Sequence, residues 1–140
     1  MKKNYNKTSK FNVFISHTTG DDAFVSLLRD ALEKENFSVW DDSHNLVAGD
    51  FLTSEIYAGI KSSDCVIVIF SDKTVNSDWV TNEINYSKKL NKRIIPLLIA
   101  GIKPNALKRW FDEELVAISV KRGKDSIVKK SYFICASIKI

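Results

Sequence analysis

Apolar residues along this chain follow two spacings, one typical of strands and one typical of helices. Short, β-prone apolar runs predict strands at 11–15, 37–40, 65–70 and 93–99, with a fifth at 115–120. Between the first two runs, apolar side chains recur with the period of a helix face; these are Phe24, Leu27, Leu28, Ala31 and Leu32. This alternation predicts an α/β fold, with an open, parallel, doubly wound sheet and helices on both faces.

Polar residues before each helical segment predict where the helices begin. Asp21 or Asp22 can cap the first helix, Asp50 the second and Ser77 the third. The second helix would bury Leu52, Ile56 and Ile60, and the third Val80, Ile84 and Ser87. Residues 107–111 are predicted to form a helical turn, whereas 125–140 fits a helix or a strand equally well.

Two strands carry further information about their place in the sheet. The run at 65–70 is apolar throughout, which predicts a strand covered on both faces. Pro96 lies within the run at 93–99 and cannot donate a backbone hydrogen bond, so that strand is predicted near an edge or at a bulge. The polar stretch 41–49 is predicted to be a loop, with Asp41 among its solvated acids.

Length and composition predict one globular domain with basic ends. The chain has 140 residues, 44% of them hydrophobic and 27% charged, with no internal repeat or linker. Residues 1–10 carry four Lys and no acid, and residues 121–140 carry six Lys or Arg against one Asp. The body at 11–120 has 11 basic and 16 acidic residues. We therefore expect a basic leader, a folded body and a basic C-terminal segment, and no binding of nucleic acid.

Several other classes of protein are not expected. The two cysteines form no disulfide framework, which favours a reducing, cytoplasmic setting. The longest apolar stretch, 94–102, is too short to span a bilayer, and the basic N-terminus leads to no signal core. Two histidines in separate segments do not predict a metal site, and neither glycine-rich phosphate-binding motif is present.

The candidate chemistry lies just after the apolar run at 65–70. Trp79 and Glu83 stand at i and i+4 of the predicted third helix and share one face. A lone acid beside an aromatic plane suits a reaction that builds positive charge on a sugar ring. Ligands of doubly wound sheets bind where the strand order reverses. In a sheet of order 2-1-3-4-5, that point brings together the loops 16–20 and 71–77.

Six segments, in order, resemble the Toll/interleukin-1 receptor (TIR) domain over residues 11–120. They are Phe14–His17, Phe37–Asp42, Asn45–Phe51, Val66–Ser71, Asp78–Glu83 and Arg93–Pro96. The resemblance implies a flavodoxin-like, five-stranded parallel sheet with a mobile loop at about 41–50. It also implies one of two functions, because many TIR domains of the prokaryotic catalytic type cleave NAD+, whereas others are non-catalytic adaptors that assemble with further TIR domains.

The resemblance implies particular roles at the site. Glu83 matches the catalytic glutamate of a W-x-x-x-E segment and Trp79 matches its tryptophan, while Phe51 matches an aromatic residue that stacks on nicotinamide. Ser16 and His17 are placed to contact the substrate, and Thr18 and Thr19 would offer it neutral hydrogen-bond donors. Relatives often carry basic residues at those two positions, where they meet the pyrophosphate, so a weaker electrostatic hold is expected here.

The chemistry of NAD+ is consistent with a single carboxylate. Nicotinamide is already a cationic pyridinium and leaves as a neutral base, so it needs no general acid and the reaction needs no cofactor. One carboxylate can stabilise the oxocarbenium-like transition state on the ribose. Attack by water gives ADP-ribose, and attack by a group of the same molecule gives a cyclic isomer. Catalytic relatives complete their site across two protomers and serve in bacterial antiphage defence, so we expect a homo-oligomer.

Two alternatives remain open at this stage. One is an adaptor that docks other TIR domains, and the other is an enzyme similar to nucleoside deoxyribosyltransferases, which acts on nucleosides. The residues also have structural interpretations: Glu83 as a solvated surface acid, and Trp79 and Phe51 as packing residues.

Overall fold

The computed structural model describes residues 11–41, 52–74, 77–113 and 115–139. Five parallel strands form one sheet in the order β2-β1-β3-β4-β5, which confirms the predicted α/β, doubly wound architecture. The strands are β1 (Asn12–Ser16), β2 (Ser38–Trp40), β3 (Cys65–Phe70), β4 (Arg93–Ile99) and β5 (Ile118–Val120).

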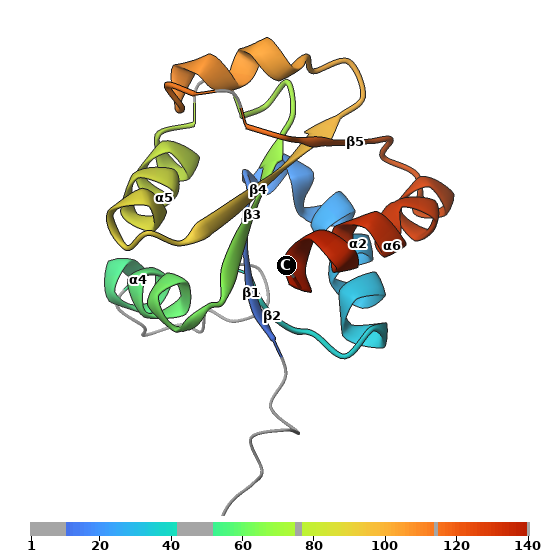
Figure 1. Ribbon diagram of the computed structural model, residues 1–140, viewed down its shortest axis with the longest axis horizontal. Coiled ribbons are helices and arrows are strands. Elements are labelled where there is room, and N and C mark those ends of the chain that lie inside the picture. The colour runs from blue at the N-terminus through green and yellow to red at the C-terminus, as the bar shows by residue number, and fades with distance from the viewer. Residues whose placement is uncertain (1–10, 42–51, 75–76, 114, 140) are drawn as a thin grey trace, which may run out of the picture.

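Helices cover both faces of this sheet. Figure 1 shows α4 and α5 on one side of it and α2 and α6 on the other. The helices are α2 (Asp22–Lys34), α4 (Leu52–Ser62), α5 (Asp78–Lys89) and α6 (Lys124–Lys139), with 3₁₀ helices η1 (Thr19–Asp21) and η2 (Pro104–Arg109). The C-terminal segment, which the sequence left open between helix and strand, forms the long helix α6.

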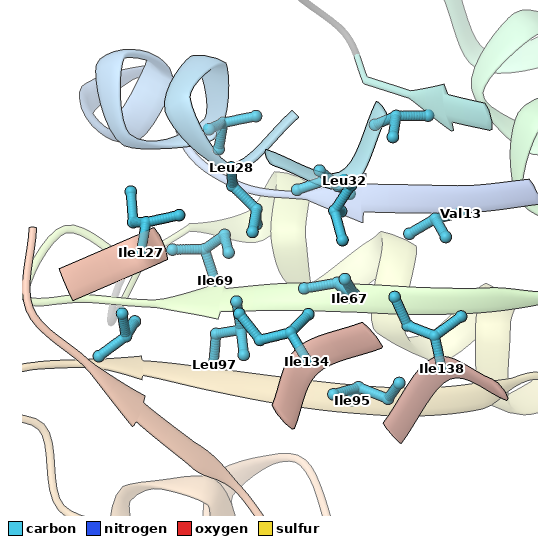
Figure 2. Packing of buried hydrophobic residues seen from close by; sticks show 14 of the residues in the cluster. Val13, Leu28, Leu32, Ile67, Ile69, Ile95, Leu97, Ile127, Ile134 and Ile138 are labelled. Atoms are coloured by element: carbon cyan, nitrogen blue, oxygen red, sulfur yellow. The ribbon is translucent and has the colours of Figure 1, made fainter. Parts of the chain in front are cut away.

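The sheet separates two apolar cores, and β3 contributes to both. All six residues of β3 are buried, as its continuous apolar sequence predicts. Its alternate residues Cys65, Ile67 and Ile69 pack toward α2 and α6, whereas Val66, Val68 and Phe70 pack toward α4 and α5. Figure 2 shows the first core, in which side chains of α2 and α6 meet those of β3 and β4.

Pro96 lies near the edge of the sheet, as predicted. It pairs in register with Val68 of β3, whereas the pairing of β4 with the edge strand β5 begins only at Leu97. Beside Pro96 there is consequently no β5 residue that needs its missing N–H. The strand β5 is shorter than the predicted 115–120, and the helical turn expected at 107–111 begins earlier, at Pro104.

The beginnings of two helices differ in how they are capped. Ser77 caps α5 as predicted, because its Oγ accepts a hydrogen bond of 3.1 Å from the Val80 N–H. Asp21 occupies the capping position of α2, but its side chain makes no capping hydrogen bond. The predicted cap at Asp50 falls outside the described residues. In the described part of the chain, the helices are too short or too polar to cross a bilayer.

Candidate active site

The candidate site lies where the strand order reverses, at the carboxyl ends of β1 and β3. These two strands are neighbours, yet the chain leaves β1 for α2 on one face and leaves β3 for α5 on the other (Figure 1). This is the topological switch point, where ligands of such sheets bind. The loops expected there, 16–20 and 71–77, meet through contacts between their described residues.

Glu83 is buried although it is an acid in the middle of a helix. Its exposed fraction is 3%, and it lies on the same side of α5 as Val80, Ile84 and Ser87. The interpretation of Glu83 as a solvated surface acid is therefore wrong. An ionised carboxylate in such a position needs hydrogen bonds to offset its loss of water.

Ser16 supplies one of those hydrogen bonds. Its Oγ donates to Glu83 Oε1 at 2.5 Å, and the exposed fraction of Ser16 is 1%. Distances of 2.5–2.7 Å are typical of charge-assisted bonds from a hydroxyl to a carboxylate. The last residue of β1 is thus joined directly to the second turn of α5.

Trp79 and Glu83 lie on one side of a small cavity between α4 and α5. The cavity has a volume of about 70 Å³, and its other lining residues are Thr53, Ile56, Tyr57 and Asn82. The predicted i, i+4 pair therefore shares one face, and that face borders an opening beside the carboxylate. Next to it, the rings of Tyr57 and Tyr86 stack with centroids 4.0 Å apart and join α4 to α5.

The side chain of His17 contacts α2, whereas that of Ser16 contacts Glu83 of α5. His17 follows Ser16 directly, just beyond the end of β1. Its ring is buried, and Nε2 lies 2.8 Å from Asp22 Oδ1 at the start of α2. The structure therefore separates His17 from the pair formed by Ser16 and Glu83. Phe51 lies outside the described residues.

The loop after β1 is held by a second buried carboxylate, that of Asp21. Its Oδ2 accepts hydrogen bonds from Ser71 Oγ at 2.6 Å and from Thr18 Oγ1 at 3.2 Å. Its Oδ1 forms an ion pair of 2.9 Å with Arg122, which comes from the turn before α6. Asp21 was one of two residues, with Asp22, expected to cap α2; its side chain instead joins three loops at the carboxyl ends of the strands. Arg122 lies too far away in sequence for any local pattern to reveal the pair.

A lysine lies against the same loop. The backbone N–H of Lys73 donates to Ser71 Oγ at 3.1 Å, and its side chain packs directly on Gly20. A Cβ atom at Gly20 would lie 2.3 Å from Lys73 Cδ, so another residue at this position would displace the Lys73 side chain. Thr18 and Thr19 are themselves neutral, but the loop after β3 places a cationic side chain against Gly20, the next residue along the chain.

Comparison with known proteins shows the family to which this chain belongs. The model of the TIR domain family matches residues 13–129, which is most of the chain. This chain belongs to the TIR domain family. Among solved structures, the TIR domain of the Toll-related receptor TRR-2 from Hydra magnipapillata has a TM-score of 0.71 at 18% identity, covering 91% of this chain and 98% of that one.

Curated relatives of this TIR domain are bacterial and archaeal proteins. It is 35% identical over 95 residues to the 2′ cyclic ADP-D-ribose synthase BtTIR of Bacteroides thetaiotaomicron, covering 64% of this chain and 33% of that protein. It is 31% identical over 135 residues to the NAD(+) hydrolase TcpA of a Theionarchaea archaeon, covering 92% of this chain and 41% of that protein. The chain therefore spans well under half the length of these relatives.

The TIR domain also has larger cavities away from Glu83. One of about 400 Å³ lies beside η2 and is lined by residues such as Leu107 and Phe111, and one of about 650 Å³ lies between β5 and α6. Neither is lined by Glu83, Ser16 or Trp79, so neither cavity belongs to the candidate site. In the described part of the chain, no three His, Cys, Asp or Glu residues gather in a way that could hold a metal ion.

Asp41 differs from the solvated loop acid that was expected. Its side chain is fully buried just after β2, and its Oδ2 accepts a hydrogen bond of 2.6 Å from Arg29 Nη1 of α2. Arg29 in turn lies 3.3 Å from Glu33 within the same helix. Asp41 therefore fixes the point at which the chain leaves the sheet, a role that an acid next to a polar stretch does not reveal in sequence.

Proposed function

We propose that this TIR domain cleaves NAD+ at the bond between nicotinamide and ribose, giving nicotinamide and either ADP-ribose or a cyclic ADP-ribose isomer. The observation that carries the proposal is the buried carboxylate of Glu83 at the topological switch point, bonded to Ser16 and bordering a cavity with Trp79. The relatives named as an NAD(+) hydrolase and a cyclic ADP-ribose synthase support it.

The proposed mechanism asks for one negative charge at the ribose. As the glycosidic bond breaks, the ring nitrogen of nicotinamide takes the bonding electron pair. Nicotinamide therefore leaves as a neutral molecule and needs no proton. The positive charge that develops on the ribose is stabilised by Glu83, which is fixed in place before the reaction begins. Water then attacks and releases a proton, or a nucleophilic group of the same ADP-ribose closes a ring.

The substrate's diphosphate requires positive charge near this carboxylate. Glu83, Asp21 and Asp22 make the edge of the sheet acidic, and Arg122 is committed to Asp21. We propose that Lys73 supplies the cation, with Thr18 and Thr19 as neutral donors. Gly20, which Lys73 covers, is four residues beyond Ser16, so the extended chain between them spans at most about 14 Å.

A second copy of the domain is proposed to complete the site. The cavity beside Glu83 holds about 70 Å³, whereas pockets that enclose small molecules usually hold about 300–1,000 Å³. The cavity that described residues line beside Glu83 is therefore too small by itself to enclose a dinucleotide. We expect turnover per molecule to rise steeply with protein concentration; full turnover by a dilute monomer would contradict this.

The rival function is that of a non-catalytic adaptor, which would act through assembly of TIR domains alone. The buried Glu83 favours the enzyme, because an adaptor has no use for a desolvated carboxylate at the ligand-binding edge of the sheet. The expected cytoplasmic location and a part in antiphage signalling belong to the proposal too; they rest on the family resemblance.

The test is to incubate concentrated protein with NAD+ and to separate the products by chromatography. We expect nicotinamide together with ADP-ribose or a cyclic isomer. The assay is repeated with CMP in place of NAD+, because a CMP N-glycosidase of Clostridium botulinum shares this fold with a TM-score of 0.61 at 20% identity. Release of cytosine without nicotinamide would favour a nucleosidase, and intact NAD+ at all protein concentrations would favour the adaptor.

A further inference from the structure

We infer that Ser16 is a positioning residue, whose hydroxyl holds the Glu83 carboxylate in the orientation that meets the ribose, and that it does not bind the substrate itself. This inference rests on the proposed function, because it assigns a part in the same reaction. It replaces the role expected from the sequence, in which Ser16 was a contact of the substrate.

The single hydroxyl proton of Ser16 is already used in a hydrogen bond to Glu83. A serine has one O–H to donate, and here it is directed at Glu83 Oε1 over 2.5 Å. The exposed fraction of Ser16 is 1%, so little of the residue is left for a ligand to touch. A substrate hydroxyl that competed for this proton would have to break a short bond to a buried carboxylate.

The placement of Ser16 makes it a rigid support. It is the last residue of β1, which lies between β2 and β3, and it pairs in register with Val68. Glu83 has a long side chain, and immobilising a glutamate costs rotamer freedom. The hydrogen bond to a central strand fixes that side chain before substrate arrives, which is the condition for electrostatic stabilisation without reorganisation.

A second serine contacts the same glutamate and provides a matched comparison. Ser87 Oγ donates to the backbone carbonyl oxygen of Glu83 at 2.7 Å, and Ser87 is fully buried as well. The two serines therefore bind different parts of Glu83: Ser16 binds the side-chain carboxylate, and Ser87 binds the backbone carbonyl oxygen. Removal of the Ser87 hydroxyl leaves the bond to the carboxylate in place, so Ser87→Ala controls for the loss of a buried hydroxyl.

The experiment compares the steady-state kinetics of NAD+ cleavage by Ser16→Ala, Ser16→Thr and Ser87→Ala at a protein concentration where the unmodified domain is fully active. We expect Ser16→Ala to lower kcat about 10- to 100-fold, the scale of one hydrogen bond to a charged group, with KM within about twofold. Ser16→Thr, which restores the hydroxyl, should recover much of that loss. Ser87→Ala should leave both constants within about twofold.

Three results would overturn the inference. A higher KM with an unchanged kcat in Ser16→Ala would make Ser16 a substrate contact, and unchanged kinetics would remove it from the site. An equal loss of kcat in Ser87→Ala would make both serines merely structural, and thermal unfolding of each variant checks that its fold is kept. A fourth result, intact NAD+ with the unmodified domain, would overturn the proposed function and this inference together. Cleavage that continues unchanged in Ser16→Ala overturns the inference alone.

Discussion

Asp21 and Ser71 are joined by a hydrogen bond of 2.6 Å between Ser71 Oγ and Asp21 Oδ2. The bond links the loop after β1 to the loop after β3, and it is buried at both ends. Because Arg122 also pairs with Asp21, the start of α6 is tied to the same point. The carboxyl ends of the strands, where the candidate site lies, are therefore fixed by a polar network as well as by apolar packing.

This network should contribute to stability. Replacement of Arg122 by Ala leaves the buried carboxylate of Asp21 without its counter-charge and should lower the free energy of unfolding by about 1–3 kcal/mol. This is less than the roughly 3–5 kcal/mol typical of breaking a fully buried pair, because the Arg122 side chain is 42% exposed. Urea unfolding measures the change. Lys129→Ala on the exposed face of α6 is the control and should stay within about 0.5 kcal/mol; equal values for the two variants would contradict the role of Asp21.

The core around β3 should not tolerate a charge. Ile67 is fully buried at the centre of the sheet, so Ile67→Asp would place a carboxylate among apolar side chains with no partner. We expect this variant to lose its folded circular dichroism signal. Val116 is 92% exposed, and Val116→Asp should leave the unfolding transition almost unchanged. A folded Ile67→Asp would mean that the two cores are not placed as described.

Lys73 should affect the binding of NAD+ more than the chemical step. Lys73→Met keeps the apolar stem on Gly20 but removes the ammonium group, so KM should rise about tenfold or more while kcat changes little. Added salt should raise KM less in this variant than in the unmodified domain, since one charge pair has been lost. The control is Lys103→Met, an exposed lysine before η2. Identical KM values for Lys73→Met and the unmodified domain would assign the diphosphate to other groups.

Cys65 should make stability depend on alkaline pH. Burial raises the pKa of its thiol to about 12, against the smaller opposing effect of the Arg93 charge. Because the folded pKa exceeds the usual value of 9.0, its contribution is fully present below about pH 9 and is lost as the pH rises toward 12. Urea midpoints should therefore fall above pH 9, and they should fall less steeply in Cys65→Ala. Parallel pH curves for both proteins would contradict a buried, neutral thiol.

Local patterns in the sequence were enough to predict much of the fold. The apolar runs gave the strands, and the switch point followed from their parallel order. Ser77 was recognised as a cap because its partner, Val80, lies three residues away. The buried side of α5 was likewise predicted from its spacing, since the bonds that form a helix are local.

The parts that could not be predicted depend on distant partners. Glu83 is hydrogen-bonded to Ser16, 67 residues earlier, and Asp21 is paired with Arg122, so neither acid's role is visible near its own position. Both Asp21 and Asp41 were assigned local roles, as a cap and as a solvated acid, because nothing nearby indicates burial. The roles of Trp79, Thr18 and Thr19 in binding substrate stay predictions.

The most direct test of the proposed function is the turnover of NAD+ by Glu83→Gln. This change keeps the shape of the side chain and its contact with Ser16 while it removes the negative charge. We expect nicotinamide release to fall by roughly 10²–10³-fold or more, the effect of removing one preorganised electrostatic group. Glu113→Gln, at an exposed acid, should release nicotinamide at the unmodified rate. If Glu83→Gln folds normally and cleaves NAD+ as fast as the unmodified domain, the central claim is wrong.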